Sequence, residues 1–308
     1  MGGGISKTYS PDAVIGGDDG MVGTGDMIRR LGVHTSIAGG IHLSMERARA
    51  LGCNTAQIFS HNPRGWRVSE ILQEAVARFK ELRAAYDINP VYVHSSYLIN
   101  LASANSETRE KSVRLLITEM DLADLLGVEY VVLHTGSAAQ EPEEEARKKA
   151  IDALKRVAQE GEWGATLLIE NTAGERGDIS SRMADLAAIL DGAGSPLLGG
   201  VCIDTCHAFQ AGYDLTNAEG VEGMKREIDA RVGMERVRLI HLNDSKRPFH
   251  SRVDRHEHIG SGMIGRKGIT NVINEPAFAK IPLVLETPKE SEEDDVRNLQ
   301  AVRNLLRI

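Results

Sequence analysis

The segment from 91 to 134 reads VYVHSSYLINLASANSETREKSVRLLITEMDLADLLGVEYVVLH and contains one complete repeat of an alternating pattern. A short apolar run, VYVHS (91–95), is followed by the amphipathic stretch SETREKSVRLLITEMDLADLLG (106–127) and by a second apolar run, YVVLH (130–134). Short apolar runs separated by helical periodicity are typical of βαβ units, whose parallel strands are buried on both faces. The segment therefore predicts a parallel sheet covered by helices.

The same alternation extends from Leu31 to the C-terminal end of the sequence. It gives eight strand candidates: LGVHTS (31–36), TAQIFS (55–60), VYVHS (91–95), YVVLH (130–134), TLLIE (166–170), GGVCID (199–204), VRLIHL (237–242) and IPLVLE (281–286). A helical pattern follows each, and the stretches at 69–86 and 106–127 both open on serine, a residue that favours helix N-termini. Eight such units favour an α/β fold with a single closed (β/α)8 barrel, or TIM barrel, over an open doubly wound sheet.

The composition is that of a globular protein. Of 308 residues, 42% are hydrophobic and 26% charged, and no apolar run approaches the ~18 residues that a membrane helix needs. Residues 1–26 are glycine-rich and lack an apolar stretch, so we expect a flexible N-terminal extension, not a signal peptide, before a barrel domain at 27–308. Three cysteines without the paired spacings of a disulfide framework fit a cytoplasmic protein.

The net charge of −8 argues against a polyanionic partner, because a uniformly acidic surface repels nucleic acid. The balance reverses between Asp244 and Lys267, however. This segment contains six basic residues: Lys246, Arg247, Arg252, Arg255, Arg266 and Lys267. A local basic face therefore remains open to a nucleic acid.

Six consecutive strand candidates end on or beside a side chain that can bind a metal. These are His94, His134, Glu170, Asp204, His241 and Glu286. Taken singly, each could be a satisfied core histidine or a paired carboxylate. In a (β/α)8 barrel, however, all strand ends meet at the face that carries the active site, and six uncompensated polar groups there would be costly to bury. We therefore expect a metal cluster at the C-terminal face of the strands.

Two loops add ligand candidates to this face. Asp204 and His207 in CIDTCHAF, and Asp254 and His256 in DRHEH, have spacings that turn both members of each pair the same way. The second pair lies in the longest segment without periodicity, 243–265, where Arg252 and Arg255 can hold a phosphate. GSGMIG (260–265) formally matches a dinucleotide-binding motif, but no strand precedes it, so we interpret its glycines as turn residues.

The candidate ligands are histidines and carboxylates only, a set that suits Zn(II) or Mn(II) at open catalytic sites. Cys202 and Cys206 are interpreted as core residues. Nine ligands are too many for one ion. At three or four protein ligands each, they predict two or three ions, an arrangement that can stabilise both sides of a phosphoryl displacement.

The chain resembles the endonuclease IV family of apurinic/apyrimidinic (AP) endonucleases over nearly its whole length from Leu31. The blocks that carry the resemblance are GVHTSIAGG (32–40), HSSYLINLAS (94–103), LHTGS (133–137), IENTAG (169–174), VCIDTCHAFQAGYDL (201–215), HLNDSK (241–246), SRVDRHEHIGSG (251–262) and LVLET (283–287). The resemblance implies a monomeric, zinc-dependent hydrolase of DNA repair. It would cut double-stranded DNA on the 5′ side of an abasic site, leaving a 3′-hydroxyl and a 5′-deoxyribose phosphate, and would also trim blocked 3′ ends.

The resemblance also implies roles for individual residues. One zinc ion would be held by His94, His134 and Glu170, and a second by Glu170, Asp204, His241 and Glu286, with Glu170 and Glu286 as catalytic carboxylates. The third would be held by His207, Asp254 and His256, with manganese possible at one or more positions. Four residues would enter the DNA at the lesion: Arg64 and Trp66 of HNPRGW (61–66), and Tyr97 and Leu98.

A sugar isomerase or epimerase with a similar barrel is the alternative. Such an enzyme would use one Mn(II) with about four ligands to carry a proton transfer, and would need neither the Asp254–His256 pair nor a DNA-wedging loop. A non-catalytic metal-binding module fits less well, because ligands around an open barrel mouth leave coordination positions free. The number of bound ions per chain distinguishes the first two interpretations.

Overall fold

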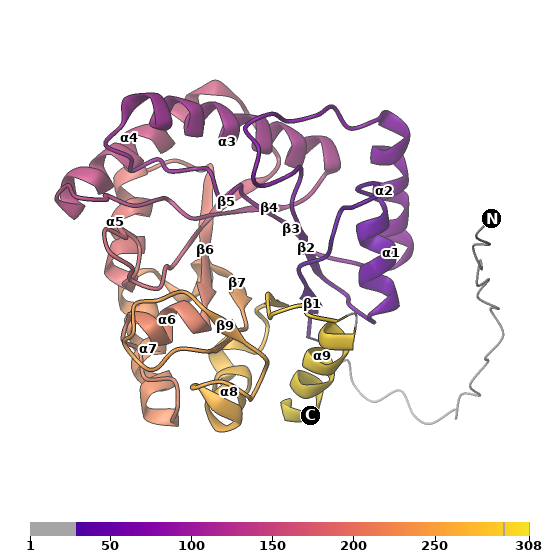
Figure 1. Cartoon of the computed structure of the whole chain (residues 1–308), viewed down its shortest axis with the longest axis vertical. Helices are drawn as coiled ribbons and strands as arrows, with labels where there is room; N and C mark the ends of the chain where they lie inside the picture. Colours follow the sequence, from indigo (N-terminus) through magenta and orange to yellow (C-terminus); the bar gives the residue numbers. More distant parts are fainter. Residues whose placement is uncertain (1–28, 292, 308) are drawn as a thin grey trace, which may run out of the picture.

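The barrel predicted by the sequence is present in the computed structural model, which describes residues 29–291 and 293–307 (Figure 1). The expected extension at 1–26 lies outside these residues. Eight parallel strands form the barrel: β1 (Leu31–Val33), β2 (Ala56–Ile58), β3 (Val91–His94), β4 (Tyr130–Leu133), β5 (Thr166–Glu170), β6 (Leu198–Asp204), β7 (Val237–His241) and β10 (Leu283–Leu285). They follow the order β1-β10-β7-β6-β5-β4-β3-β2. The barrel is nearly closed, because His34 and Gln57 form a single parallel bridge between β1 and β2.

Helices surround the strands (Figure 1). Their bounds are α1 (Leu43–Ala50), α2 (Gln73–Ala85), α3 (Ser106–Leu126), α4 (Glu143–Glu160), α5 (Met183–Ala193), α6 (Thr205–Ala211), α7 (Ala218–Arg231), α8 (Gly265–Ile273) and α9 (Glu293–Leu305). Two 3-10 turns, η1 (Met234–Arg236) and η2 (Pro276–Phe278), precede β7 and β10. Within the described part of the chain, no helix is long and apolar enough to cross a membrane.

The barrel interior is filled by one layer of side chains from six strands. These are Tyr92, Val132, Leu168, Cys202, Leu239 and Val284, all fully buried. Such a layer makes a TIM barrel a packed core and not a pore, so the strand ends above it form the floor of any site. Cys202 therefore has the packing role that the sequence predicted.

The expectation that serines cap two helices was wrong. α3 begins at Ser106, but its cap is Asn105, whose extended backbone lets the side-chain oxygen accept a hydrogen bond from the Thr108 amide at 2.9 Å. α2 begins at Gln73, four residues after the serine at 69, and no side chain caps it. The half-buried Val68 and Ile71 of the preceding segment pack against the core.

The loop after β7 is organised around one buried carboxylate. Asp244, in the short strand β8 (Asp244–Ser245), accepts hydrogen bonds at 2.8–3.2 Å from five backbone amides, those of Ser245, Gly260, Gly262, Ile264 and Gly265. A Cβ at position 262 would lie 2.5 Å from the Asp244 oxygen. The glycines of GSGMIG thus wrap the chain around an internal anion. Pairing of β8 with β9 (His256–Glu257) then places the DRHEH segment beside the strand ends.

We predict that Gly32→Ala strongly destabilises the barrel. A Cβ on this β1 residue would lie 1.9 Å from the backbone oxygen of Thr55, and rigid backbone cannot move away. We expect the free energy of unfolding to fall by about 3 kcal/mol, the upper range for overpacking. Gly223→Ala in α7 is the matched control, because nothing lies within 4 Å of its added Cβ. The free energy of unfolding of this control should rise by up to about 1 kcal/mol, because alanine has a higher helix propensity than glycine. Equal denaturation midpoints for the two variants would contradict the prediction.

Candidate active site

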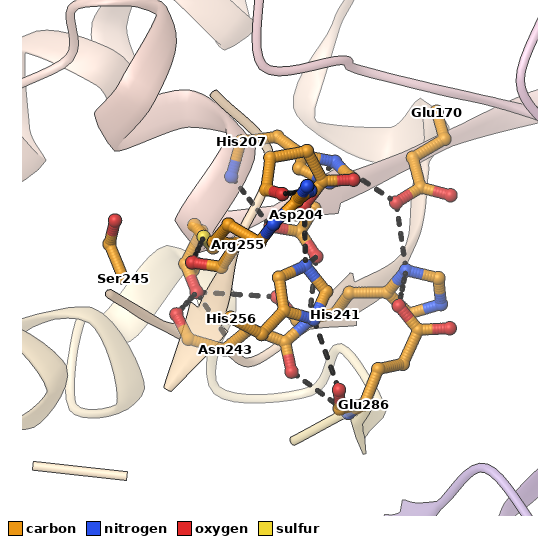
Figure 2. A network of polar contacts seen from close by, with 12 residues as sticks. Glu170, Asp204, His207, His241, Asn243, Ser245, Arg255, His256 and Glu286 are labelled. Carbon is orange, nitrogen blue, oxygen red and sulfur yellow. Dashed lines mark hydrogen bonds and ion pairs between the residues drawn. The ribbon is translucent and has the colours of Figure 1, made fainter. Parts of the chain in front are cut away.

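The nine candidate ligands lie together at the C-terminal ends of the strands. Figure 2 shows side chains from β5, β6, β7, α6 and the loop after β7 converging on one point. A cavity of about 780 Å³ opens above them. Six of the nine candidates line it, and so do the aromatic side chains of Phe59 and Tyr97. The barrel mouth therefore combines ligand candidates with aromatic surface.

The nine side chains form three groups, two of which share Glu170. In each group, the possible ligand atoms all lie within 4.8 Å of one another. The groups are His94, His134 and Glu170; Glu170, Asp204, His241 and Glu286; and His207, Asp254 and His256. This is the same division that the family resemblance implies. Two further groups bring Cys202 and Cys206 within the same distance of these ligands. Burial raises the pKa of the Cys202 thiol to about 12, which favours the protonated, non-ligating form.

Glu170 is the centre of the arrangement. Its fully buried carboxylate has one oxygen 2.9 Å from His134 Nε2 and the other 2.9 Å from His241 Nδ1. His94 Nε2 and His207 Nδ1 each lie 3.4 Å from it. Because four histidines from different elements surround one carboxylate, Glu170 can bridge two of the groups.

Three histidines are oriented by the backbone. The Nδ1 atoms of His94, His207 and His256 each donate a hydrogen bond to a main-chain carbonyl, at 2.8, 2.9 and 3.0 Å. A neutral imidazole that donates from Nδ1 carries its lone pair on Nε2. In the neutral form, each of these rings would therefore direct an unprotonated Nε2 away from the backbone, as ligating histidines do.

His256 tests whether the residues fit a metal. Its Nε2 is buried and has no hydrogen-bond partner, yet it lies 3.4 Å from an oxygen of Asp254 and 3.7 Å from one of Asp204. A lone pair that faces two carboxylates is unfavourable unless a cation lies between them. The geometry and the donor chemistry both fit a divalent ion.

The centre attracts positive charge. Burial alone would raise the pKa of the Glu170 carboxyl, but His241 and His134 hold it well below its usual range. Burial would lower the pKa of His207, but Asp204 and Asp254 raise it well above the usual value. Four carboxylates in so small a volume need compensation, which protonated histidines or divalent cations can supply.

Comparison with known proteins agrees with this geometry. A family model described as "Xylose isomerase-like TIM barrel" matches residues 45–307. A "Probable endonuclease 4" from Methanoculleus marisnigri is 42% identical over 276 residues, which cover 89% of this chain and 98% of that protein. The crystal structure of endonuclease IV from Thermus thermophilus matches at 41% identity with a TM-score of 0.79, over 90% of this chain and 98% of the other. The chain belongs to the endonuclease IV family.

The barrel fold of this endonuclease IV family member also occurs in a sugar-epimerase-like protein. The crystal structure of a D-tagatose 3-epimerase-like protein covers 89% of this chain with a TM-score of 0.66, but the sequences are 21% identical. Similarity at this level shows a common fold. The reaction has to be inferred from the residues of the site.

The residues expected to contact DNA lie around the cavity mouth. Tyr97 is 65% exposed and Trp66 is 43% exposed, and Arg64 is exposed on the same loop as Trp66. Leu98 is half-buried and packs partly against the core, so it has less free surface than a wedge residue alone would have. Tyr97 is the only member of this set that lines the cavity among the residues described there.

The two arginines of the DRHEH loop differ in their surroundings. Arg255 is exposed, and its guanidinium donates a hydrogen bond to the Asp254 carbonyl. Arg252 lies 3.4 Å from the His250 ring and lines a second cavity of about 510 Å³, away from the nine candidates. Arg255 directly precedes the candidate ligand His256 in the chain, whereas Arg252 lines the second cavity.

The sequence analysis did not identify the glutamine and asparagine side chains that orient the candidate ligands. Gln57 accepts a hydrogen bond from His241 Nε2 at 2.8 Å and donates to Glu286 at 2.5 Å, so it fixes ligands on two strands. Asn243 donates to Asp204 at 2.6 Å and accepts from the Glu286 amide at 2.8 Å. The Asn171 side chain donates to the carbonyl of Asp204 and accepts from its amide. The polar Gln57 within the apolar run TAQIFS was the one available signal.

Proposed function

We propose that this protein is a metal-dependent AP endonuclease that hydrolyses the phosphodiester on the 5′ side of an abasic site, leaving a 3′-hydroxyl and a 5′-deoxyribose phosphate. The convergence of nine histidines and carboxylates as three groups in one barrel mouth supports this proposal. A single-metal isomerase needs one such group, whereas three groups suit the displacement of a charged phosphate. The same centre would accept blocked 3′ ends, because there too the bond to be broken joins phosphorus to a 3′-oxygen.

Each of the three groups would hold one zinc ion, with manganese as an alternative. Bound ions would make water nucleophilic at neutral pH and offset the negative charge that develops on the phosphate. Glu170 would keep two of the groups together, and Asn243 and Gln57 would fix Asp204, His241 and Glu286 through the contacts described above. The chain's own residues would thus orient the metal ligands. Water would be the nucleophile, so no covalent intermediate between enzyme and DNA is needed.

The cavity would receive the extruded abasic nucleotide. Extrusion costs least where the base is already missing, because little stacking is lost. Phe59 and Tyr97 in the cavity lining could pack against a deoxyribose ring, while the ligand candidates in the same lining would face its phosphate. The exposed Arg64, Trp66 and Tyr97 would fill the gap in the helix.

A cleavage assay with counted metals tests the proposal. A duplex with one abasic site and a 5′ label should yield a single product ending in a 3′-hydroxyl that a polymerase extends. Elemental analysis of the same preparation should give about three ions per chain. One ion per chain with epimerisation of a ketose and no cleavage would instead establish the sugar-enzyme alternative.

Binding should depend steeply on salt. If basic residues at the mouth neutralise DNA phosphates, log K against log[salt] should slope by about −0.9 for each phosphate neutralised. Arg255→Gln should reduce the magnitude of this slope by about 1, because Arg255 is exposed and lies between the candidate ligands Asp254 and His256 in the chain. Lys155→Gln on α4 is the control and should leave it unchanged. Fluorescence anisotropy with abasic duplex measures both, and a flat dependence would point to a small neutral substrate.

A further inference from the structure

Outside the metal centre, one buried pair of titratable groups has no role in the chemistry proposed above. His61 and Glu119 are 7% and 1% exposed, and His61 Nε2 lies 2.8 Å from a Glu119 carboxylate oxygen, Oε1. Glu119 lies on the barrel-facing side of α3, whereas His61 begins the loop that follows β2. Burying a carboxylate is costly, so a structural or functional reason for this pair is expected.

The same carboxylate oxygen also holds a second loop. The backbone amide of Ser96 donates to Glu119 Oε1 at 2.9 Å. Ser96 belongs to the loop after β3, which continues into Tyr97 and Leu98, while His61 belongs to the loop that carries Arg64 and Trp66. One oxygen atom on a rigid helix is therefore the common acceptor of both loops proposed to enter the DNA.

A hydroxyl group joins the two loops directly. Ser96 Oγ donates to the carbonyl of Pro63 at 2.7 Å and accepts from the amide of Leu98 at 3.2 Å. Within the first loop, the Asn62 side chain accepts from the amide of Arg64 at 3.1 Å. Ser96 thus ties the backbone next to Arg64 to the backbone of Leu98.

We propose that Glu119 is a positioning residue that locks these two loops into one preformed wedge. This inference rests on the proposed AP endonuclease function and assigns the residues on which lesion recognition depends. A wedge that is ordered before binding loses less conformational freedom when it enters DNA, and so binds the unstacked duplex more tightly. Glu119 touches neither the substrate nor the candidate ligands in this arrangement, and it acts through His61 and Ser96.

The test separates lesion binding from the chemical step. In Glu119→Ala we expect the KM for abasic duplex to rise about tenfold, while kcat and the metal content stay within twofold of the parent. The fluorescence rise of 2-aminopurine next to the lesion, which reports unstacking, should fall by more than half. Glu119→Gln keeps an oxygen that can accept from Ser96, and should recover part of both effects. Asp185→Asn on α5 is the matched control, because it perturbs another buried ion pair, with Arg147, far along the chain from both loops.

A double-mutant cycle tests the coupling itself. In the parent, the affinity losses of Arg64→Ala and Leu98→Ala should be non-additive by about fivefold or more, as expected for residues in one hydrogen-bond network. In the Glu119→Ala background the two losses should become additive. If Glu119→Ala does not fold, Ser96→Ala, which removes only the hydroxyl bridge, carries the same test.

Two results would overturn the inference: additive losses in the parent, or unchanged KM and unstacking in a folded Glu119→Ala protein. Either can occur while the parent still cleaves abasic DNA, in which case the loops act independently. If the parent neither binds nor cleaves abasic duplex, the proposed function fails instead, and the two failures are distinguishable.

Discussion

Glu170→Gln should reduce the kcat for abasic DNA by on the order of 1,000-fold or more, an effect of about 4 kcal/mol on the barrier. Glu170 is the one residue that belongs to two of the three ligand groups. An amide offers a neutral oxygen and a nitrogen that repels cations, so the substitution weakens two ions at once. The fold should survive, because the glutamine side chain has nearly the same volume and shape.

The comparison with Glu286→Gln makes this prediction specific. Glu286 belongs to a single group, so its glutamine variant should lose about one ion and Glu170→Gln about two. Glu290→Gln, at an exposed position four residues further along the chain, should lose none and keep full activity. Elemental analysis and single-turnover cleavage at saturating enzyme measure both quantities. Parental cleavage and full metal content in Glu170→Gln would remove this residue from the centre.

Removal of the metals should lower the melting temperature by about 10 °C or more. At a thousandfold excess over the dissociation constant, each ion stabilises the folded state by about 4 kcal/mol. Each kcal/mol corresponds to roughly 2–4 °C for a domain of 150–250 residues and to less in a longer chain. Without ions, the carboxylates of Asp204, Asp254 and their neighbours keep only protonated histidines as compensation.

Calorimetry of the protein before and after dialysis against a chelator provides the measurement. Zinc added back should restore both the melting temperature and cleavage, and magnesium should not, because histidine nitrogens are poor ligands for it. Glu170→Gln is the control, since it should show a smaller drop on chelation than the parent. A protein that elemental analysis shows to be metal-free, yet melts at the parental temperature, would contradict the prediction.

The fold and the ligand set were accessible from sequence for the same reason. Buried parallel strands are short apolar runs, so a histidine or carboxylate at the end of a run, such as His134 in YVVLH or Glu170 in TLLIE, is visible against its background. The barrel rule then places all such ends on one face without knowledge of any contact. His207 and Asp254 lie outside strands, and their side-chain direction could be inferred only from spacing within each pair.

The remaining features depend on contacts between distant parts of the chain. His61 and Glu119 are 58 residues apart and meet only because α3 packs beside the loop after β2. No periodicity connects them, and each taken alone resembles an ordinary polar residue. The cap of α3 was missed for a local reason, because Asn105 and Ser106 are both good caps and the backbone angles decide between them.

The five amides that surround Asp244 have a consequence for how glycine-rich loops are interpreted. Nucleotide-binding loops use the same device, successive N–H groups around a concave space, but there the negative charge arrives with the ligand. Here the negative charge is the carboxylate of Asp244, which occupies the space between the N–H groups. A glycine spacing of this kind therefore indicates that the loop encloses an anion. It does not tell whether that anion is a bound ligand or a side-chain carboxylate of the same chain. In this loop a carboxylate of the chain itself takes the place that a bound anion has in a nucleotide site, so one glycine spacing can serve structure as well as binding.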